Sequence, residues 1–426
     1  MFILSKSFRA APKASPRNWG RSRKRANPHY GIEPLENRVL LSGYSVIANF
    51  TGTNGNEPYG GLVADSSGNL YGTTYIGGAN NDGTIFEIAH GTSTITVLHS
   101  FTSSDGYEPY DQLLIDSSGN LYGTTYGGGA HVEGVIFEYS TSSSTFSDLY
   151  SFKSSGDGKN PRGGLIMDSS GDLYGQTKAG GASSDGAIYE LTKSGGSYSA
   201  SDTILYNFTG VSPDGLGPYS ALTLDGSGDL FGTTRNGGTN NDGTIFELVN
   251  GNTAPTILYS FTDSTTNGEE PDSALLIDSS GDLIGTAQQG GASSDGTIFE
   301  LTKSGGSYSN SLTLLASFNG SGSSSKNGEY PYDAPLMDSH GDIFGTNEGG
   351  GQYNDGTVWE LPQGSTAITI LHQFAGGTSD GKNPYGSIYM DAQGNLWGTT
   401  EIAGTSNDGT IFEYAATEKL AFAAQP

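Results

Sequence analysis

The sequence predicts an all-β protein: a seven-bladed β-propeller built of four-stranded antiparallel blades. The first observation is a motif that recurs seven times along the 426 residues and reads approximately D-x-S-G-[ND]-L-[YF]-G-T-T, G-G, [ND]-D-G-T-I-[FY]-E and L-x-S-F. The second is that its short apolar runs lack the 3.6-residue period of a helix. The third is that the two ends of the repeat array complement each other. The units begin at Asp65, Asp116, Asp168, Asp225, Asp278, Asp338 and Asp391.

The spacing and the composition of the units predict the blades. The units follow one another at intervals of 51 to 60 residues, so each is one supersecondary element that buries its apolar face against its neighbours. In the first unit the expected strands are residues 61–65, 69–74, 83–88 and 95–101, which are rich in β-branched and aromatic residues and are separated by Gly, Asn, Asp and Ser. Four such strands form a propeller blade. An open β-solenoid is the alternative, although its repeats usually run to roughly 20–30 residues.

The ends of the array predict how the ring closes. The seventh unit has no clear fourth strand, because the chain changes character at Ala415 and offers only K-L-A-F at residues 419–422. A strand of the missing type, residues 44–50, precedes the first unit and aligns with residues 257–261. We therefore expect this N-terminal strand to form the outermost strand of the last blade, because an open sheet edge would expose unpaired amides.

The chain divides into three predicted parts. Residues 1–43 hold nine basic and two acidic residues and are expected to be a disordered leader of the export or sorting kind; a basic tail that contacts anionic surfaces is the alternative. Residues 44–414 are the expected propeller, and residues 415–426 are a tail or the start of a further segment. Residues 35–41 (L-E-N-R-V-L-L) resemble the LEPR-XLL segment of exported proteins of planctomycete-like bacteria, with Asn37 at the proline position.

The repeat itself resembles the GloVer tandem repeats of Gloeobacter- and Verrucomicrobia-like bacteria. The resemblance is carried by N-L-Y-G-T-T and N-D-G-T-I-F-E, as at residues 69–74 and 81–87, and extends over most of the chain. It implies an exported protein with a propeller-like body, usually with a C-terminal sorting or anchoring segment. The C-terminal E-K-L-A-F-A-A-Q-P departs from such a segment. The resemblance implies no particular activity.

Composition narrows the classes of partner. Residues 44–426 hold ten basic and 43 acidic residues, and such a negative body repels phosphate backbones, so no nucleic-acid binding is expected. The absence of cysteine excludes disulfides, thiolate metal sites and cysteine nucleophiles. No stretch of 18 apolar residues is present, so no membrane span is expected, and the predicted state is a monomer.

The recurring acidic residues predict structure rather than chemistry. An Asp followed by Gly suits a tight turn, and a calcium loop would need a closing bidentate Glu that the D-x-S-G turns lack. The Glu of T-I-F-E recurs in all seven units, whereas a single active site would need a unique set. No two histidines have a metal-ligand spacing. We therefore expect no catalytic residue, no metal and no cofactor.

Positions that vary between the units are the candidate binding residues. If the strand at 61–65 is innermost, the loop after each G-T-T and the loop before each innermost strand share one face of the ring, and variation on a constant frame is typical of a recognition surface. Unconstrained drift is the alternative. The seven positions after G-T-T are Tyr75, Tyr126, Lys178, Arg235, Gln288, Glu348 and Glu401.

These observations predict a non-catalytic repeat protein that is secreted or held at the cell surface of a Gram-negative-type bacterium. It would act there as a binding or structural module with a protein or glycan partner. A lyase or hydrolase with its site at the channel mouth is one alternative. A spacer segment of a larger adhesin is the other.

Overall fold

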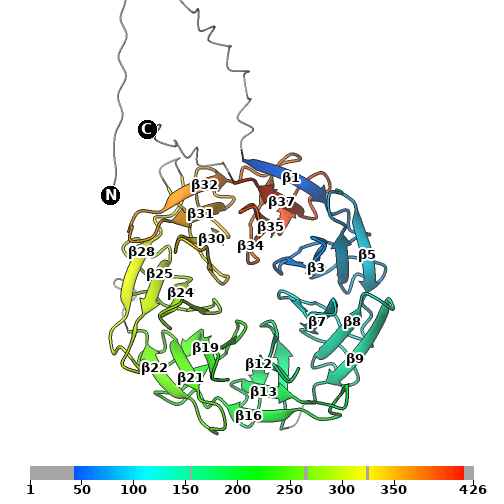
Figure 1. Cartoon of the computed structure of the whole chain (residues 1–426). Coiled ribbons are helices and arrows are strands. Elements are labelled where there is room, and N and C mark those ends of the chain that lie inside the picture. Colours follow the sequence, from blue (N-terminus) through cyan, green and yellow to red (C-terminus); the bar gives the residue numbers. More distant parts are fainter. Residues whose placement is uncertain (1–42, 154–155, 263–266, 323–325, 417–426) are drawn as a thin grey trace, which may run out of the picture. The chain divides into compact units, whose positions relative to one another are not determined.

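The computed structural model describes residues 43–153, 156–262, 267–322 and 326–416, which form seven antiparallel blades around a central channel (Figure 1). These described residues contain strands, turns and bends but no helix, and so none that could cross a membrane. The predicted all-β seven-bladed propeller is therefore confirmed. The predicted leader up to residue 42, and residues 417–426 with their K-L-A-F run, lie outside the described residues.

Each blade contains four strands, numbered here from the channel outward. Blade 1 comprises β2 (Val63–Ala64), β3 (Leu70–Thr74), β4 (Thr84–Ile88) and β5 (Ile95–Ser100), and blade 2 comprises β6 (Leu114–Ile115), β7 (Asn120–Thr125), β8 (Val135–Ser140) and β9 (Thr145–Ser151). Blade 3 comprises β11 (Ile166–Met167), β12 (Leu173–Gly180), β13 (Ala187–Leu191) and β16 (Thr203–Asn207), with β10 (Gly158–Pro161) added to the end of β12. Blade 4 comprises β18 (Thr223–Leu224), β19 (Leu230–Thr234), β21 (Thr244–Leu248) and β22 (Thr256–Ser260).

The remaining blades follow the same order. Blade 5 comprises β23 (Leu276–Ile277), β24 (Leu283–Ala287), β25 (Thr297–Leu301) and β28 (Thr313–Ser317), and blade 6 comprises β29 (Leu336–Met337), β30 (Ile343–Asn347), β31 (Thr357–Leu361) and β32 (Thr369–Gln373). Blade 7 comprises β34 (Tyr389–Met390), β35 (Leu396–Thr400), β37 (Thr410–Tyr414) and β1 (Tyr44–Asn49). Short two-stranded pairs supplement the blades: β14 (Lys193–Ser194) with β15 (Ser197–Tyr198), β17 (Gly215–Leu216) with β20 (Asn236–Gly237), β26 (Lys303–Ser304) with β27 (Ser307–Tyr308), and β33 (Gly381–Lys382) with β36 (Ile402–Ala403).

The N-terminal strand closes the ring as predicted. Strand β1 pairs antiparallel with β37, with Tyr44 opposite Tyr414 and Asn49 opposite Thr410 (Figure 1). The residue after β1, Phe50, is fully buried and meets Phe86 of blade 1 edge-on at 5.1 Å between ring centroids. The first described strand of the chain therefore completes blade 7 and also packs it against blade 1.

The Gly of each G-T-T is required by side-chain packing rather than by a turn. Gly72 lies within β3, opposite Phe86 of β4. A Cβ added to Gly72 would stand 2.7 Å from the Phe86 ring, closer than two carbon atoms can approach. The strand has no side chain at this position, so the aromatic ring of T-I-F-E can pack directly against its backbone.

The repeated Asp and Glu together hold the aromatic residue of the second strand. In blade 1, Asp65 accepts the backbone N–H of Ser67 at 2.8 Å and that of Asn69 at 3.0 Å, which shapes the turn. The Tyr71 hydroxyl bonds to Asp65 at 3.1 Å and to Glu87 at 3.2 Å. Both carboxylates therefore have structural roles in this blade.

Outer strands of adjacent blades meet through stacked rings at two of the seams. Tyr44 stacks on His372 of blade 6 with centroids 3.6 Å apart, and Phe146 stacks on His99 of blade 1 at 4.1 Å. Each of these two rings lies six residues before the buried Phe that follows its outermost strand. The ring at this position covers the outer edge of the preceding blade.

Blade 3 places a carboxyl group at that seam. Asp202 lies six residues before Phe208, in the position of the stacked rings, and faces Tyr150 of β9 and Asp157 of the connection between blades 2 and 3. The Tyr150 hydroxyl donates to Asp157 at 2.6 Å, and one Asp202 oxygen is buried without a hydrogen-bond partner. Burial, and then the hydrogen bond and charge of Asp157, raise the pKa of Asp202 to about 7.

Candidate binding site at the channel mouth

The loops after G-T-T and the loops before the innermost strands share one face, here called the mouth face. The backbone N–H of Tyr75 donates to the carbonyl of Glu57 at 2.9 Å, and that of Glu401 donates to Asn383 at 2.9 Å. Glu57 and Asn383 precede prolines and adopt positive φ, near 56° and 55°. L-residues rarely adopt this conformation, so the loops are held in one shape by the surrounding contacts.

The N-D-G turns tie each blade to the next at this face. The carbonyl of Asp82 accepts the N–H of Glu108 at 3.1 Å, and the carbonyl of Glu133 accepts that of Asn160 at 2.8 Å. The contact uses the main chain, which explains why Glu133 can replace Asp in the second unit. A Cβ on the following glycine, Gly83, would stand 2.7 Å from a proline of the next blade.

The seven positions predicted from the sequence lie around this face. Six of them are half-buried, whereas Gln288 is buried. They do not contact one another as a continuous ring, although Lys178 lies 5.9 Å from the Tyr126 ring and the charge of Glu401 acts on Glu348. Most of their contacts are with residues that the sequence analysis did not single out.

Those residues immediately follow the prolines that precede the innermost strands. All seven line the cavity at the centre of the ring and are here called the mouth cluster: Tyr59, Tyr110, Arg162, Tyr219, Asp272, Tyr332 and Tyr385. The signal was present in the sequence, because a proline recurs before each innermost strand and is followed by Tyr in five of the seven cases and by Arg162 and Asp272 in the other two.

The tyrosines of the mouth cluster pack against one another across blade boundaries. Tyr59 stacks on Tyr110 with centroids 5.0 Å apart, and Tyr332 stacks on Tyr385 at 4.5 Å. Tyr59 and Tyr385 meet edge-on at 5.0 Å. Tyr75 joins this group edge-on to Tyr59 at 5.1 Å. The rings form one contiguous aromatic surface over blades 6, 7, 1 and 2.

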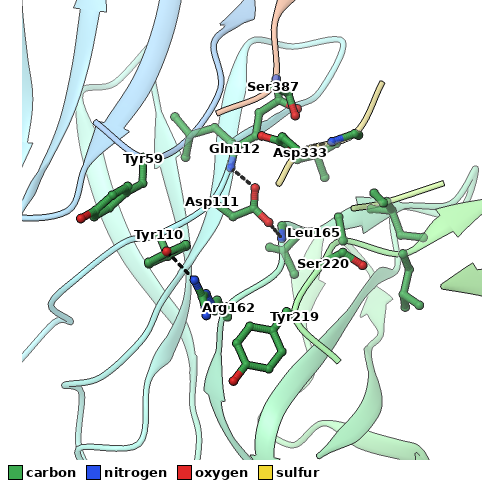
Figure 2. Close-up of a pocket in the computed structure, with 18 of the residues that line it drawn as sticks. Tyr59, Tyr110, Asp111, Gln112, Arg162, Leu165, Tyr219, Ser220, Asp333 and Ser387 are labelled. Carbon is green, nitrogen blue, oxygen red and sulfur yellow. Dashed lines mark hydrogen bonds between the residues drawn. The ribbon is translucent and has the colours of Figure 1, made fainter. Parts of the chain in front are cut away.

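Arg162 joins this aromatic surface to the other side of the channel. Its guanidinium lies 4.2 Å from the Tyr110 ring centroid and 4.6 Å from that of Tyr219 (Figure 2). It donates to the hydroxyl of Tyr110 at 2.5 Å and to that of Tyr385 at 3.0 Å. Arg162 precedes blade 3 and Tyr385 precedes blade 7, so the mouth cluster bridges the channel.

Charges are divided between two sectors of the mouth face. Lys178, Arg162 and Arg235 come from units 3 and 4, and Lys178 lies 5.1 Å from the Tyr219 ring. Arg235 pairs with Glu270 at 2.6 Å and with Asp272 at 2.8 Å.

The acidic sector comes from units 6, 7 and 1. Glu401 accepts the Tyr59 hydroxyl at 2.9 Å, and burial followed by the charge of Glu401 raises the pKa of Glu348. Burial, and then the charge of Glu401, also raise the pKa of the nearby Glu57.

The cavity bordered by the mouth cluster has a volume of about 380 Å³. Besides Asp272 of the mouth cluster, its wall includes Leu165 and the carboxyl groups of Asp111 and Asp333 (Figure 2). Asp111 accepts the backbone N–H of Gln112 at 2.6 Å and that of Gly164 at 2.5 Å. Part of the surface of Asp111 faces the cavity, although the residue lies deep in the ring. Burial, and then the negative charge of Asp333, raise the pKa of its carboxyl group. The described residues contain no group of three or more His, Cys, Asp or Glu side chains that could hold a metal ion.

The profile of the Gloeobacter/Verrucomicrobia repeat family matches residues 38–224 and 307–424. The chain belongs to this family. The match confirms the resemblance seen in the repeat, while the LEPR-XLL-like segment stays a prediction. Among proteins with curated descriptions, none matches this Gloeobacter/Verrucomicrobia repeat protein.

Solved structures are similar to this chain at 12% sequence identity. The extracellular domain of a B. thetaiotaomicron protein, described in one structure as a hybrid two-component system and in another as a one-component system, has 12% identity and a TM-score of 0.55 in both. The match covers 86% of the repeat protein but only 39% and 40% of those chains. A protein assigned as a 6-phosphogluconolactonase from Bacteroides uniformis has 12% identity and a TM-score of 0.47, over 73% of this chain and 83% of that one.

Proposed function

We propose that the protein is an exported, non-catalytic binding module that holds a protein partner at the cell surface with its mouth face. The observation that carries the proposal is the mouth cluster, in which five tyrosines and Arg162 meet at the centre of the ring. Tyrosine and arginine are enriched among the residues that dominate protein–protein binding energy, and such residues cluster near the centre of an interface.

The rigidity of the cluster supports this role. The Tyr110 ring is covered by Tyr59 and by Arg162, and the Tyr385 ring packs on Tyr332. Side chains fixed before binding lose little conformational entropy when a partner arrives. The same packing disfavours a glycan ligand, because a sugar ring needs an aromatic face that no neighbour covers.

The division of charge predicts the kind of partner surface. Lys178 gives one sector of the mouth face a positive charge, since Arg235 there is already paired with Glu270 and Asp272, and Glu348 and Glu401 make the other sector acidic. A partner surface would match this face if it carried an acidic group opposite Lys178 and basic groups opposite Glu348 and Glu401. Complementary charges raise the association rate and fix orientation more than they raise affinity. We therefore expect association to slow as salt is raised.

The test is capture of surface proteins of the producing bacterium on the immobilised full-length chain, with affinity measured for the protein retained. Arg235→Ala and Tyr126→Ala are expected to weaken binding at least tenfold, whereas His90→Ala, on the opposite face, leaves it unchanged. Equal binding by all four proteins would refute the mouth face as the site. Binding to a glycan array that Tyr126→Ala abolishes would replace the protein partner by a glycan.

A second candidate function rests on Asp111 and Asp333. Paired carboxyl groups in one pocket, with the pKa of each raised by burial, resemble the acid–base pairs of hydrolases and lyases. Their main-chain hydrogen bonds also fit a purely structural role. Turnover of a polysaccharide or lactone panel that Asp111→Asn abolishes, with the fold retained by circular dichroism, would favour the enzyme.

A further inference from the structure

Blade 5 lacks the aromatic residue that the second strand of every other blade carries. At this position the side chain packs into the seam with the next blade, and where it is Tyr or Trp its polar atom donates to the Asp of the turn, to the Glu of T-I-F-E, or to both. The seven residues are Tyr71, Tyr122, Tyr174, Phe231, Ile284, Phe344 and Trp397.

Two blades show how a tyrosine occupies this position. Tyr122 of blade 2 is fully buried, and its hydroxyl bonds to Asp116 at 3.2 Å and to Glu138 at 3.1 Å. The hydroxyl of Tyr71 in blade 1 bridges the equivalent Asp and Glu at 3.1 and 3.2 Å. One phenol therefore fills the seam and satisfies two carboxylates at once.

In blade 5 the ring is replaced by Ile284, which is buried (2% exposed) in the seam core together with Ile298 and Leu361. Ile284 lies at the base of a groove of about 660 Å³ between blades 5 and 6, and Asp278 and Glu300 are in its wall. Met337 and Leu361 of blade 6 form the apolar opposite side. The groove lies on the face that carries the D-x-S-G turns, away from the mouth cluster.

The two carboxylates of this groove lack the tyrosine hydroxyl that bridges their counterparts in blades 1 and 2. Asp278 accepts the backbone N–H of Ser280 at 2.8 Å and that of Asp282 at 2.9 Å, both with one oxygen. Within the described part of the chain, no side chain donates a hydrogen bond to Glu300. Burial, then the charges of Asp282 and Asp278, raise the pKa of Glu300, as expected of a carboxylate without a compensating donor.

We propose that the groove between blades 5 and 6 binds the phenol ring of a tyrosine side chain from a partner polypeptide, with its hydroxyl donating to Asp278 and Glu300. The ring would lie in the groove over Ile284, so that its hydroxyl reaches the pair of carboxylates equivalent to the pair that Tyr71 and Tyr122 reach from within their own seams. A partially exposed apolar residue at the rim, Leu314 (37% exposed), offers contact to the residues flanking that tyrosine. An indole satisfies fewer acceptors, because Trp397 reaches only its turn Asp, at 3.1 Å.

The test compares N-acetyl-tyrosinamide with N-acetyl-phenylalaninamide by titration of the full-length protein, followed by NMR or calorimetry. The tyrosine probe is expected to bind about tenfold tighter or more, because a site that offers charged acceptors discriminates strongly for a hydroxyl donor. Glu300→Gln should reduce this preference without changing the affinity for the phenylalanine probe.

Ile284→Tyr supplies the missing ring from the chain itself, so it should abolish probe binding and raise the melting temperature. Phe344→Tyr, in a seam that already holds a ring, is the matched control and should leave binding unchanged. Equal affinity for the two probes, or full binding by Ile284→Tyr, would overturn the proposal. Binding of free p-cresol without binding of the tyrosine probe would overturn the polypeptide as the source.

Discussion

Replacing Asp202 by Asn should change how stability depends on pH. The pKa of Asp202 in the folded protein is about 7, against roughly 3.9 for an unperturbed Asp. A carboxyl group whose pKa is raised on folding binds its proton more tightly in the folded state. The contribution of Asp202 to stability is therefore fully present below pH 4, is lost as the pH rises from about 4 to 7, and does not change further above 7.

The magnitude follows from the size of the shift. Three pKa units correspond to about 4 kcal/mol at most, and solvent screening of this partly accessible group reduces the expected value to about 1–2 kcal/mol. Asn stays neutral and can still donate a hydrogen bond to Asp157, so the variant does not lose stability in this way as the pH rises. Its stability relative to the wild type should rise by about 1–2 kcal/mol between pH 4 and pH 8.

Urea unfolding followed by tyrosine fluorescence at pH 4, 6 and 8 measures the difference. Asp148→Asn, on the outer strand of blade 2, is the control for a general change in net charge. A difference between wild type and Asp202→Asn that stays constant with pH, or that shrinks as the pH rises, would refute the assignment of the buried proton to this seam.

Three further predictions concern the ring and its mouth. Phe50→Ala should destabilise the protein by about 3–5 kcal/mol in urea unfolding, as Phe261→Ala should in blade 4; a loss below about 1 kcal/mol would contradict the role of the N-terminal strand in closing the ring. Gly232→Ala should cost at least about 1–3 kcal/mol, because its Cβ would stand 2.6 Å from the Phe246 ring; an unchanged melting temperature would show that the ring can move aside. Arg162→Met should lower the melting temperature and increase acrylamide quenching of tyrosine fluorescence, because it removes the link between the two sides of the channel; unchanged quenching would argue against that link.

The sequence predicted whatever depends on repetition. The period and the turn residues predicted the blades, and residues 44–50 predicted the closing strand because they match a strand that the seventh unit lacks. Contacts between residues on opposite sides of the ring could not be predicted from the repeat. Arg162 and Tyr385 are 223 residues apart, and their hydrogen bond depends on the radius of the closed ring and on the direction in which each loop points.

The groove at Ile284 could be predicted only in part from the sequence. The substitution of Ile for an aromatic residue is visible in the aligned units, but its consequence is not, because neighbouring side chains can collapse into a vacated space. The structure shows that Met337 and Leu361 pack into the same core as Ile284 and that a groove remains above them between blades 5 and 6. The raised pKa of Asp202 likewise depends on Asp157, 45 positions earlier, which only the fold brings to the same seam.

The closing strand also determines how the ring responds to mechanical load. Tyr44, where β1 begins, lies opposite Tyr414, where β37 ends, so the two chain ends leave the ladder at the same corner. A force that pulls these ends apart would open the pairs one at a time, from Tyr44 toward Asn49, rather than load all of them together in shear. In a single-molecule stretching experiment the ring should therefore open at low force, with blade 7 separating first.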